Sequence, residues 1–430
     1  MNKMVNIAIV GLGQVGNYLY NELNLKKKSI EVKTGKRLNI AAISARNKSK
    51  KRKFEVNKEI FFSNPLKIFE KKKIDILFEC VGLSDGISKK IVEKALKNKV
   101  SVITPNKALI AKHGDQLSRL AEKNKVNLEF EASVAGGIQI LRTIKDGLAT
   151  NKIKKVYGIL NGTTNYILSE MEKSNLSFDK VLKKAQILGY AEPGNPKLDL
   201  NGIDAFSKVR ILSALAFNNR ISKKDCIIQG IEKIELKDIK IANQLNLRIK
   251  LLGISELINN RLFETVHPCL VGNTTYIGNV DGVMNAVILE GKPIGQCILQ
   301  GEGAGPGPTS SSLLSDLLSI LRGVVKDPFG IPFKKRKSLK TFNNDSYLNS
   351  LYLRFEVKDK PGVLSSITER LAKYRISIKR IIQTPDKKSK KATIVIITHK
   401  TSELNSRNCL SIFKKNKNIL KSPILIRLYN

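Results

Sequence analysis

The stretch VNIAIVGLGQVG, residues 5–16, decides the fold of the N-terminal part of this chain of 430 residues. Its first half is an apolar run typical of a β-strand, its second half matches GxGxxG, and an amphipathic, helix-like pattern follows over residues 15–25. In this context the glycines allow the backbone to approach a pyrophosphate, and the start of the helix attracts its charge. A tight turn without a ligand is the alternative, but the context favours dinucleotide binding.

The first third of the chain repeats this alternation of β and α patterns. A helical pattern covers residues 87–97, and further β-type runs lie around it. Such alternation predicts a mostly parallel sheet with helices on both faces, a Rossmann-type α/β fold. We expect this nucleotide-binding domain to span residues 1–130 and to be completed by about 301–325. The further β-type runs cover residues 38–45, 74–80, 100–103 and 126–130.

The rest of the chain divides into two more predicted domains and a linker. Residues 131–300 mix strand-like runs such as 155–160 with helical runs such as 203–217, which predicts an α+β domain for substrate binding and dimerisation. A linker rich in Pro, Lys and Asn follows, at residues 327–348. The order of patterns in residues 349–430 is β-α-β-β-α-β, which predicts a ferredoxin-like domain.

The composition restricts the class of protein. The five cysteines include no CxxC pair, which argues against a disulfide framework or a zinc site and favours a reducing compartment. No apolar run has the length of a membrane span, so we expect a soluble, cytoplasmic protein without a membrane partner. The formal net charge of +39 raises the question of nucleic-acid binding. Because the lysines are spread over many short clusters and no Arg-rich tail is present, we expect no nucleic-acid partner.

The end of the second predicted strand bears on the choice between NAD and NADP. A site for NAD places an acidic residue there to bind the ribose 2′-hydroxyl, whereas this chain has Arg46 and Lys48. Positive charge suits the 2′-phosphate of NADP, so we predict an NADP preference and leave NAD open as a second cofactor. The alternative is that both side chains are ordinary surface charges of a basic protein.

Two segments combine small and polar residues after a predicted strand: EASVAGGI at residues 131–138 and LNGTTNYIL at 160–168. Runs of this kind allow the backbone to lie close to a ligand. Backbone carbonyls together with one carboxylate, that of Glu131, would suit a hard cation. A bare hinge is the alternative.

Candidate acid–base residues lie in GIDAFSK, residues 202–208. Asp204 and Lys208 share a face if the segment is helical. Lys208 has apolar neighbours, and partial burial would lower its pKa and suit a general acid. A surface ion pair is the alternative. A second lysine, Lys107, ends the segment TPNK at the end of a predicted strand, where open α/β sheets bind their ligands.

Together these segments resemble homoserine dehydrogenase over residues 5 to about 325. The most specific are LNGTTNYIL, GIDAFSK, LGYAE at residues 188–192 and GEGAGPGPT at 301–309. The resemblance implies the reversible, NADP-dependent interconversion of L-homoserine and L-aspartate 4-semialdehyde, on the route to threonine and methionine. Because no kinase-like segment precedes the nucleotide-binding pattern, we expect the monofunctional form of the enzyme.

The resemblance also implies roles for individual residues. Lys208 would give and take the proton at the C4 oxygen of the substrate, with Asp204 orienting substrate or water beside it. Glu192 would hold the substrate ammonium group, and Lys107 would bridge nicotinamide and substrate. Asp199 would contact the substrate from a loop that is one residue longer than is usual in the family. A sodium ion would be bound by Glu131 and by the carbonyls of Val134, Gly136 and Ile138. The implied cofactor-binding residues are Gly11, Gly13, Gln14, Val15, Gly16, Arg46, Lys48, Thr104, Lys107 and Gly305.

Residues 349–430 resemble an ACT domain, with DKPGVL at residues 359–364 as the turn into its first helix. Such domains bind a pathway amino acid, so the resemblance implies feedback regulation, most plausibly by threonine. It also implies assembly into a homodimer or homotetramer.

Two other functions fit parts of the sequence. Another semialdehyde or amino-acid dehydrogenase would keep the nucleotide-binding fold, and a phosphorylating one would need a catalytic cysteine, for which Cys80 has no suitable context. An amino-acid-sensing, nucleic-acid-binding regulator is supported only by the net charge and the C-terminal domain. Homoserine-dependent formation of NADPH would exclude the regulator as the main function.

Overall fold

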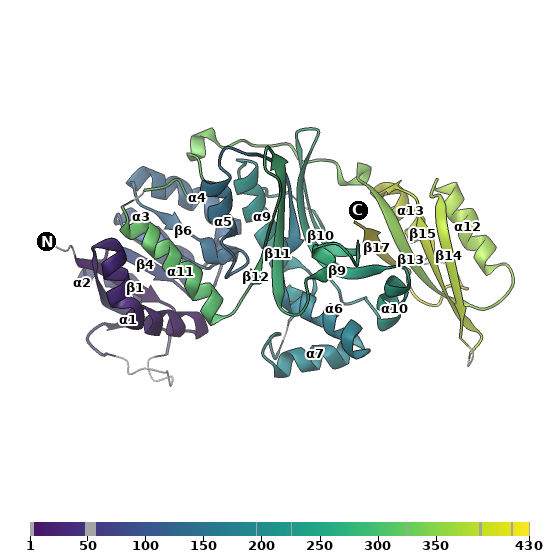
Figure 1. The fold of residues 1–430 in the computed structure, drawn as a ribbon, viewed down its shortest axis with the longest axis horizontal. Coiled ribbons are helices and arrows are strands. Elements are labelled where there is room, and N and C mark those ends of the chain that lie inside the picture. Colours follow the sequence, from purple (N-terminus) through teal and green to yellow (C-terminus); the bar gives the residue numbers. More distant parts are fainter. Residues whose placement is uncertain are drawn as a thin grey trace.

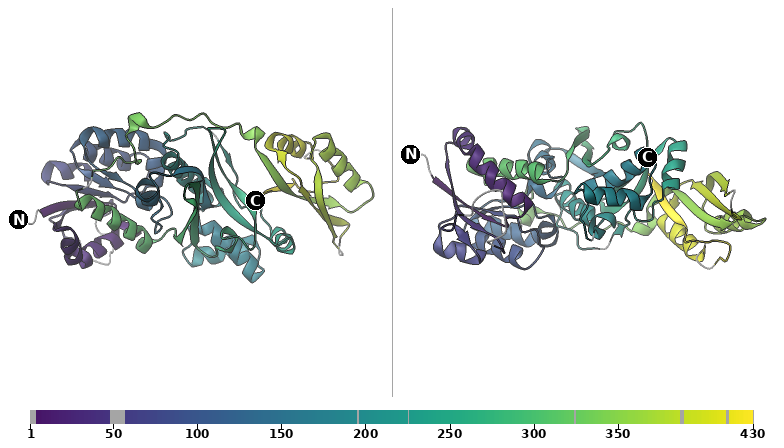
Figure 2. Two further views of the ribbon diagram at one scale, coloured as in Figure 1. Left: turned by 45° about the horizontal axis from the view of Figure 1, so that its top comes forward. Right: turned by 90° about the horizontal axis from the view of Figure 1, so that it is seen from below.

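The computed structural model describes residues 4–47, 57–194, 196–224, 226–323, 325–386, 389–413 and 416–429. Three parts follow one another along its long axis: an N-terminal α/β domain, a central domain and a C-terminal domain (Figures 1 and 2). Within the described ranges, no helix is both long enough and apolar enough to cross a membrane.

The N-terminal domain is built on a parallel six-stranded sheet in the order β3-β2-β1-β4-β5-β6. The chain fills one side of β1 first and then crosses to β4 on the other side. The carboxyl ends of β1 and β4 therefore border the crevice in which sheets of this type bind ligands. The strands are β1 (Met4–Val10), β2 (Arg37–Ser44), β3 (Phe61–Phe62), β4 (Ile76–Glu79), β5 (Ser101–Ile103) and β6 (Leu128–Glu129).

Helices cover both faces of this sheet, as predicted. Along β1, Ile7 and Ile9 pack into one core and Ala8 and Val10 into the other. Burial on both faces explains why the strands are continuous apolar runs in the sequence. The first core lies under α1 (Gln14–Thr34) and α11 (Pro306–Leu321), and the second under α3 (Ile87–Lys97) and α4 (Lys107–Asn124), with the short α2 (Ile68–Lys71) beside it.

The central domain contributes one end of an 11-stranded sheet, in which nine strands follow the order β12-β11-β7-β9-β10-β17-β13-β15-β14 and two short strands, β8 and β16, pair with β10 and β13. The long hairpin of β9 and β10 turns at Asn259 and Asn260, which both have positive φ. Asparagine tolerates this conformation better than most residues. The strands are β7 (Lys152–Ile159), β8 (Ile227–Ile228), β9 (Leu247–Ile258), β10 (Arg261–Gly272), β11 (Met284–Lys292) and β12 (Gly295–Glu302). The helices are α5 (Ile140–Arg142), α6 (Gly162–Ser174), α7 (Phe178–Ile187), α8 (Lys197–Leu200), α9 (Ile203–Ala216) and α10 (Leu236–Gln244).

The C-terminal domain has the predicted ferredoxin-like order, with one short extra strand, β16. Its last strand, β17, lies between β13 and β10, so that it joins this domain to the central one. Nothing in the sequence pattern predicts this shared sheet. The elements are β13 (Leu348–Lys358), α12 (Val363–Lys373), β14 (Ile378–Pro385), β15 (Lys391–Thr398), β16 (Thr401–Ser402), α13 (Glu403–Phe413) and β17 (Ile424–Leu428).

A buried ion pair strengthens the junction of these two domains. Arg354 on β13 is 2% exposed, and its Nε donates to Oδ1 of Asp238 on α10 at 2.7 Å. The hydroxyl of Tyr352 donates to the same oxygen at 2.8 Å. A buried charge without its partner is costly, so the pair favours one arrangement of the domains.

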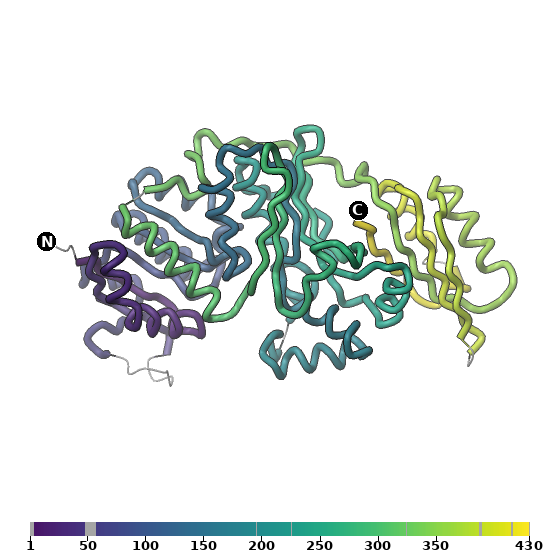
Figure 3. Tube along the Cα trace, in the orientation of Figure 1, coloured from purple at the N-terminus to yellow at the C-terminus, as the bar shows by residue number. Residues whose placement is uncertain are grey.

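The predicted linker follows the outside of the central domain from α11 to β13, along the upper edge of Figure 3. It is bound to that domain by backbone hydrogen bonds. The amide of Lys337 donates to the carbonyl of Asn218 at 2.8 Å, and the amide of Leu262 donates to the carbonyl of Lys340 at 2.9 Å. The linker is therefore a packed segment of the fold.

Candidate active site

Two lysines and one aspartate meet where the N-terminal domain contacts the central domain. Lys107 begins α4, and Asp204 and Lys208 lie on α9. The Nζ atom of Lys107 lies 2.8 Å from Oδ1 of Asp204, and the Nζ atom of Lys208 lies 2.9 Å from Oδ2. One carboxylate thus binds an ammonium group from each domain.

The start of α9 explains how Asp204 and Lys208 are placed. Gly202 precedes the helix with φ of 85°, a left-handed conformation that favours glycine. Asp204 then lies in the first turn, where the partial positive charge of the helix N-terminus stabilises a carboxylate. Lys208 is one turn further along on the same face, as the spacing predicted.

Asn161, which lies in the segment LNGTTNYIL, binds two of the carboxylates of the site, although the sequence assigns it no role. It caps α6, since its Oδ1 accepts a hydrogen bond from the amide of Thr164 at 2.9 Å. Its Nδ2 donates to Asp199 Oδ1 at 2.8 Å and to Asp204 Oδ2 at 3.1 Å. Beside it, the carbonyl of Leu160 accepts a hydrogen bond from Lys208 Nζ at 2.6 Å. An asparagine between a strand and a helix predicts a helix cap, but the hydrogen bonds from its Nδ2 to Asp199 and Asp204 depend on the tertiary fold.

The two lysines have different environments. Lys208 is buried, with 6% of the residue exposed, and burial lowers its pKa despite the opposing charge of Asp204. The side chain of Lys107 is 40% exposed. Burial of its ammonium opposes the charged form, but Asp204, Asp199 and Glu192 outweigh this and raise its pKa. Lys208 is therefore the lysine that loses its proton more readily.

The carboxylates of the cluster also differ. Burial disfavours the charged form of Asp204, but Lys208 and Lys107 outweigh it and hold the pKa of Asp204 well below its usual range. Burial, followed by the charge of Asp204, raises the pKa of Asp199. Glu192 is exposed, and its charge acts on Lys107. The structure therefore brings Lys107, Lys208, Asp204 and Asp199 together, and Glu192 acts on this cluster through its charge.

A cavity of about 730 Å³ lies at the glycine-rich turn, between the carboxyl ends of β2 and β4. The glycines fit a bound dinucleotide in different ways. A Cβ at Gly11 would lie 2.5 Å from the backbone of Cys80, and one at Gly16 would lie 1.9 Å from the carbonyl oxygen of Gly11. At Gly13 nothing lies within 4 Å, which leaves room for a phosphate to approach the backbone. The first turn of α1 contains Gln14 and Val15.

The rim of this cavity bears on cofactor choice. Arg46 lines it and is exposed, whereas Lys48 lies outside the residues that the structure describes. The described residues that line the cavity include no Asp or Glu. The rim of the cavity therefore carries the positive charge of Arg46.

Two other predicted cofactor residues are placed differently. Thr104 is fully buried, and its hydroxyl donates to Glu79 at 2.7 Å, so this side chain already has its hydrogen-bond partner. Gly305 precedes α11 with φ of 109°. Its turn packs against the segment proposed for cation binding, where a Cβ at Gly136 would lie 2.7 Å from the carbonyl oxygen of Gly303.

The segment from Glu131 to Ile138 has the donor chemistry of a site for a hard monovalent cation, one carboxylate and several carbonyls. Glu131 is buried, and burial raises its pKa. Its oxygens accept hydrogen bonds from the amides of Leu141 and Arg142 at 2.8 and 2.7 Å, and the Gly136 carbonyl accepts one from Ser312 at 2.6 Å. Each oxygen keeps lone-pair capacity, so these residues fit such an ion. Among the described residues, no group of three or more His, Cys, Asp or Glu could hold a metal.

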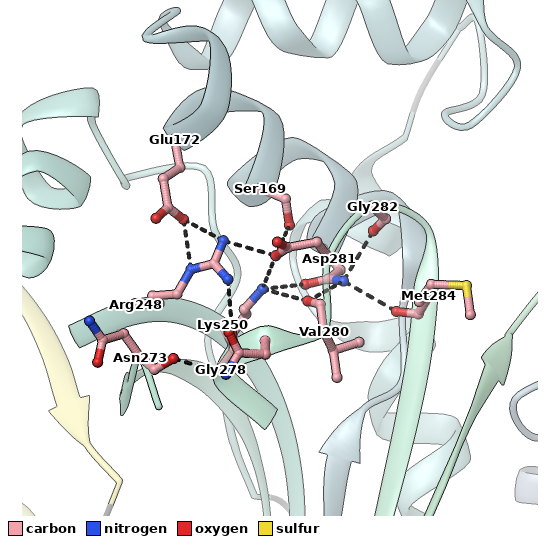
Figure 4. Close-up of polar contacts among 12 residues, drawn as sticks. Ser169, Glu172, Arg248, Lys250, Asn273, Gly278, Val280, Asp281, Gly282 and Met284 are labelled. Carbon is pink, nitrogen blue, oxygen red and sulfur yellow. Dashed lines mark hydrogen bonds and ion pairs between the residues drawn. The ribbon is translucent and has the colours of Figure 1, made fainter. Parts of the chain in front are cut away.

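A second polar cluster connects α6 to β9 and to the loop before β11 (Figure 4). Lys250 on β9 is 1% exposed, and its Nζ donates to the Val280 carbonyl at 2.5 Å and to Asp281 Oδ1 at 3.0 Å. Asn165 on α6 donates to the carbonyls of Val280, Gly282 and Met284. The cluster thus binds the loop before β11 to α6, the helix that Asn161 caps. The sequence pattern gave no sign of it, because a lysine inside a strand resembles a solvent-facing residue.

Family models match most of the chain. The model described as homoserine dehydrogenase matches residues 140–318, and the one for its NAD binding domain matches residues 11–131. A model of the ACT domain matches residues 351–416.

Relatives and solved structures agree with these matches. A homoserine dehydrogenase of Neisseria gonorrhoeae is 37% identical over 99% of both chains, and one of Helicobacter pylori is 37% identical over 100% of both. The crystal structure of a homoserine dehydrogenase from Thiobacillus denitrificans superposes with a TM-score of 0.90 at 32% identity and covers 100% of both chains. A hyperthermophilic archaeal homoserine dehydrogenase in complex with NADPH superposes with a TM-score of 0.62 at 26% identity, and covers 74% of this chain and 97% of the archaeal one.

Proposed function

Because the chain belongs to the homoserine dehydrogenase family, whose members are NAD(P)-dependent oxidoreductases acting on CH–OH groups, we propose that Lys208 is its proton donor and acceptor. The observation that carries this proposal is the pair of lysines on Asp204, of which only the buried Lys208 has a lowered pKa. The regulator that binds nucleic acid is not favoured, since the matched relatives are named as homoserine dehydrogenases.

The proton chemistry follows from this pair. When bound, the nicotinamide cofactor supplies or accepts the hydride at the substrate carbon. As the aldehyde is reduced, the Lys208 ammonium stabilises the charge that grows on its oxygen and then donates a proton to it. In the oxidation of homoserine, the neutral amine takes the hydroxyl proton, and a lowered pKa makes this neutral form easier to reach than in an exposed lysine. Asp204 holds the ammonium in position through its Oδ2.

Three other residues would bind the substrate around this point. The exposed carboxylate of Glu192 would hold the substrate ammonium group at the rim, and Lys107 would bridge substrate and nicotinamide. Asp199 shares Asn161 with Asp204 and so lies within reach of the same substrate. The pKa of Asp199 is raised whereas that of Asp204 is lowered, so Asp199 is the more easily neutralised of the two aspartates.

We propose NADP as the preferred cofactor. Arg46 at the cavity supplies positive charge for the 2′-phosphate, and Lys48 follows it two positions later in the sequence. The archaeal relative that was solved with NADPH supports this choice only by analogy. Gly11, Gly13 and Gly16 would hold the pyrophosphate against the start of α1.

A sodium ion is proposed at Glu131 and the carbonyls of Val134, Gly136 and Ile138. The segment packs against the turn that contains Gly305, so an ion there would stabilise the backbone on which this turn rests. It would act on the shape of the site rather than on the reacting atoms. The proposed ligands, one carboxylate and three backbone carbonyls, are the oxygen donors that suit such an ion.

Regulation and assembly remain proposals that rest on the C-terminal domain. We propose threonine as the effector and a homodimer or homotetramer as the assembly. A cytoplasmic location fits the five free cysteines, none of which is in a disulfide.

The experiment that tests the proposed function is a continuous absorbance assay at 340 nm (about the maximum of a reduced nicotinamide) with homoserine and either NADP or NAD. Homoserine-dependent reduction of NADP, lost in Lys208→Met and retained in a surface lysine variant, is the expected result. Activity that survives Lys208→Met would refute the assignment of the proton donor.

A further inference from the structure

The carboxyl end of β4 carries a glutamate, Glu79, to which the mechanism above gives no role. Its side chain is fully buried, 0% exposed, although the crevice opens immediately beside it. The next two residues, Cys80 and Val81, line the cofactor cavity. A buried carboxylate at this position has to be stabilised by neighbouring donors.

Five hydrogen bonds supply that stabilisation. Oε1 of Glu79 accepts from the amides of Val81 and Gly82 at 2.9 and 3.3 Å and from the hydroxyl of Ser88 at 2.9 Å. Oε2 accepts from the hydroxyl of Thr104 at 2.7 Å and from Nδ2 of Asn106 at 3.3 Å. One carboxylate therefore joins the loop after β4, the first turn of α3 and the loop between β5 and α4.

The two hydroxyl groups of the shell can use their protons for Glu79, because each of them accepts its other hydrogen bond from a backbone amide. The Ser88 hydroxyl accepts from the amide of Leu83 at 3.3 Å, and the Thr104 hydroxyl accepts from the amide of Asn106 at 3.0 Å. Both hydroxyl protons are then directed to Glu79. A shell made only of donors suits an ionised carboxylate, which accepts and does not donate.

This shell reaches the candidate active site through Asn106. Its Nδ2 is held by Glu79 and by the Leu83 carbonyl, while its Oδ1 caps α4 by accepting from the amide of Leu109 at 3.0 Å. The amide group is thus fixed at both ends, and the next residue is Lys107, whose ammonium binds Asp204.

We propose that Glu79 is a positioning residue: it fixes the start of α4 so that Lys107 meets Asp204 and the substrate. The inference rests on the role proposed for Lys107. Glu79 touches neither Asp204 nor Lys208 and acts only through the loop ends that it binds. Removing its acceptors would release the Asn106 cap and let the Lys107 ammonium move away from the crevice.

Glu79→Gln is the test variant, because it keeps the size of the side chain and replaces one acceptor by a donor. In a shell of donors the new NH₂ group faces N–H or O–H groups whichever way it turns. The expected result is a fall of about 10²-fold in kcat/KM for homoserine, the size of effect that a displacement of about 1 Å can have. The dissociation constant of NADPH, measured by fluorescence, should stay close to that of the wild type, because the pyrophosphate is bound at Gly11–Gly16.

Two companions make the result specific. Glu79→Asp keeps the carboxylate on a shorter side chain and should recover part of the kcat/KM that Glu79→Gln loses. If Glu79→Gln does not fold, Glu79→Asp serves as the test variant in its place. Glu264→Gln makes the same change at another buried glutamate, on β10, 2% exposed and with its pKa raised by burial. It should leave kcat/KM unchanged.

The decisive measurement is a double-mutant cycle with Lys107→Met. If Glu79 acts through Lys107, then Glu79→Gln should cause little further loss in the Lys107→Met background. Full additivity of two impaired single variants would refute the inference and leave the role of Lys107 intact. A Lys107→Met enzyme with normal kcat/KM would instead refute the role proposed for Lys107, and this inference with it.

Discussion

Lys107 and Lys208 bind opposite oxygens of the same carboxylate, although the first belongs to the N-terminal domain and the second to the central one. Their shared partner affects them unequally. Burial keeps the pKa of Lys208 below its usual value, whereas Asp204 and two further carboxylates raise the pKa of Lys107. The geometry alone does not distinguish the two candidate proton donors, and these opposite pKa shifts favour Lys208.

The first prediction concerns the identity of the proton donor. Lys208→Met removes the proton and the charge and keeps the apolar stem, so turnover should fall by roughly 10²-fold or more. Binding of NADPH should change little. Lys183→Met, on the exposed face of α7, is the matched control and should keep full turnover. Near-normal turnover in Lys208→Met together with an inactive Lys107→Met would assign the proton to the other lysine.

The second prediction concerns pH. Oxidation of homoserine needs neutral Lys208, so kcat should rise as pH rises through its pKa. The charge of Asp204 raises this pKa and that of Lys107 lowers it. The normalised profile of Asp204→Asn should therefore move to lower pH, and that of Lys107→Met to higher pH. Profiles that move in the same direction would contradict the proposed electrostatics.

The third prediction concerns the cofactor. Arg46→Glu should raise KM for NADP by about tenfold or more, the effect of losing one charge-assisted hydrogen bond, and should leave KM for NAD nearly unchanged. Arg37→Glu is the control, because Arg37 is exposed at the opposite end of the same strand, β2. A wild-type enzyme with higher kcat/KM for NAD than for NADP would show the proposal to be wrong.

The fourth prediction concerns the junction between the domains. Arg354→Met leaves Asp238 buried without its cation and should lower the free energy of unfolding by about 3–5 kcal/mol in a urea titration. Arg407→Met, in the same domain as Arg354, breaks an exposed ion pair with Asp345 of the linker and should cost only about 0–1 kcal/mol. Equal effects of the two variants would mean that the buried pair does not hold the junction.

The fifth prediction is inhibition by threonine. Removing residues 347–430 is the obvious test, and from the sequence it should leave activity and abolish sensitivity. The structure argues against that design, because the deletion would unpair β10 from β17 and strip Asp238 of Arg354. The intact chain should instead be assayed with threonine and with other pathway amino acids. Activity that none of them changes would rule out feedback control.

Sequence patterns predicted those features that depend on local periodicity. The apolar runs between helical patterns predicted the parallel sheet, and the spacing of Asp204 and Lys208 predicted that they share a face of a helix, where they form an ion pair of 2.9 Å. The sequence also placed Lys107 after a strand, but its bond to Asp204 depends on how two domains pack.

Other features lacked a local signal. Asn161 reads as a helix cap and Glu79 as one more strand residue, and only the tertiary fold shows the hydrogen bonds that each makes. Thr104 is implied for cofactor binding by the family resemblance, and only the fold shows that its hydroxyl donates to Glu79. Patterns locate such residues, but their partners come from distant segments.

The position of β17 also has a consequence for how the protein folds while the ribosome synthesises it. The ribosome makes β17 after every other strand of the 11-stranded sheet, yet this strand lies inside the sheet, between β10 and β13. Until Ile424–Leu428 has been made, β10 keeps an unpaired edge that includes Cys269 and Leu270. Exposed strand edges pair readily with other chains. The nascent protein should therefore need protection from aggregation between the synthesis of β10 and that of β17, and the catalytic and C-terminal domains should complete their folding in one final step.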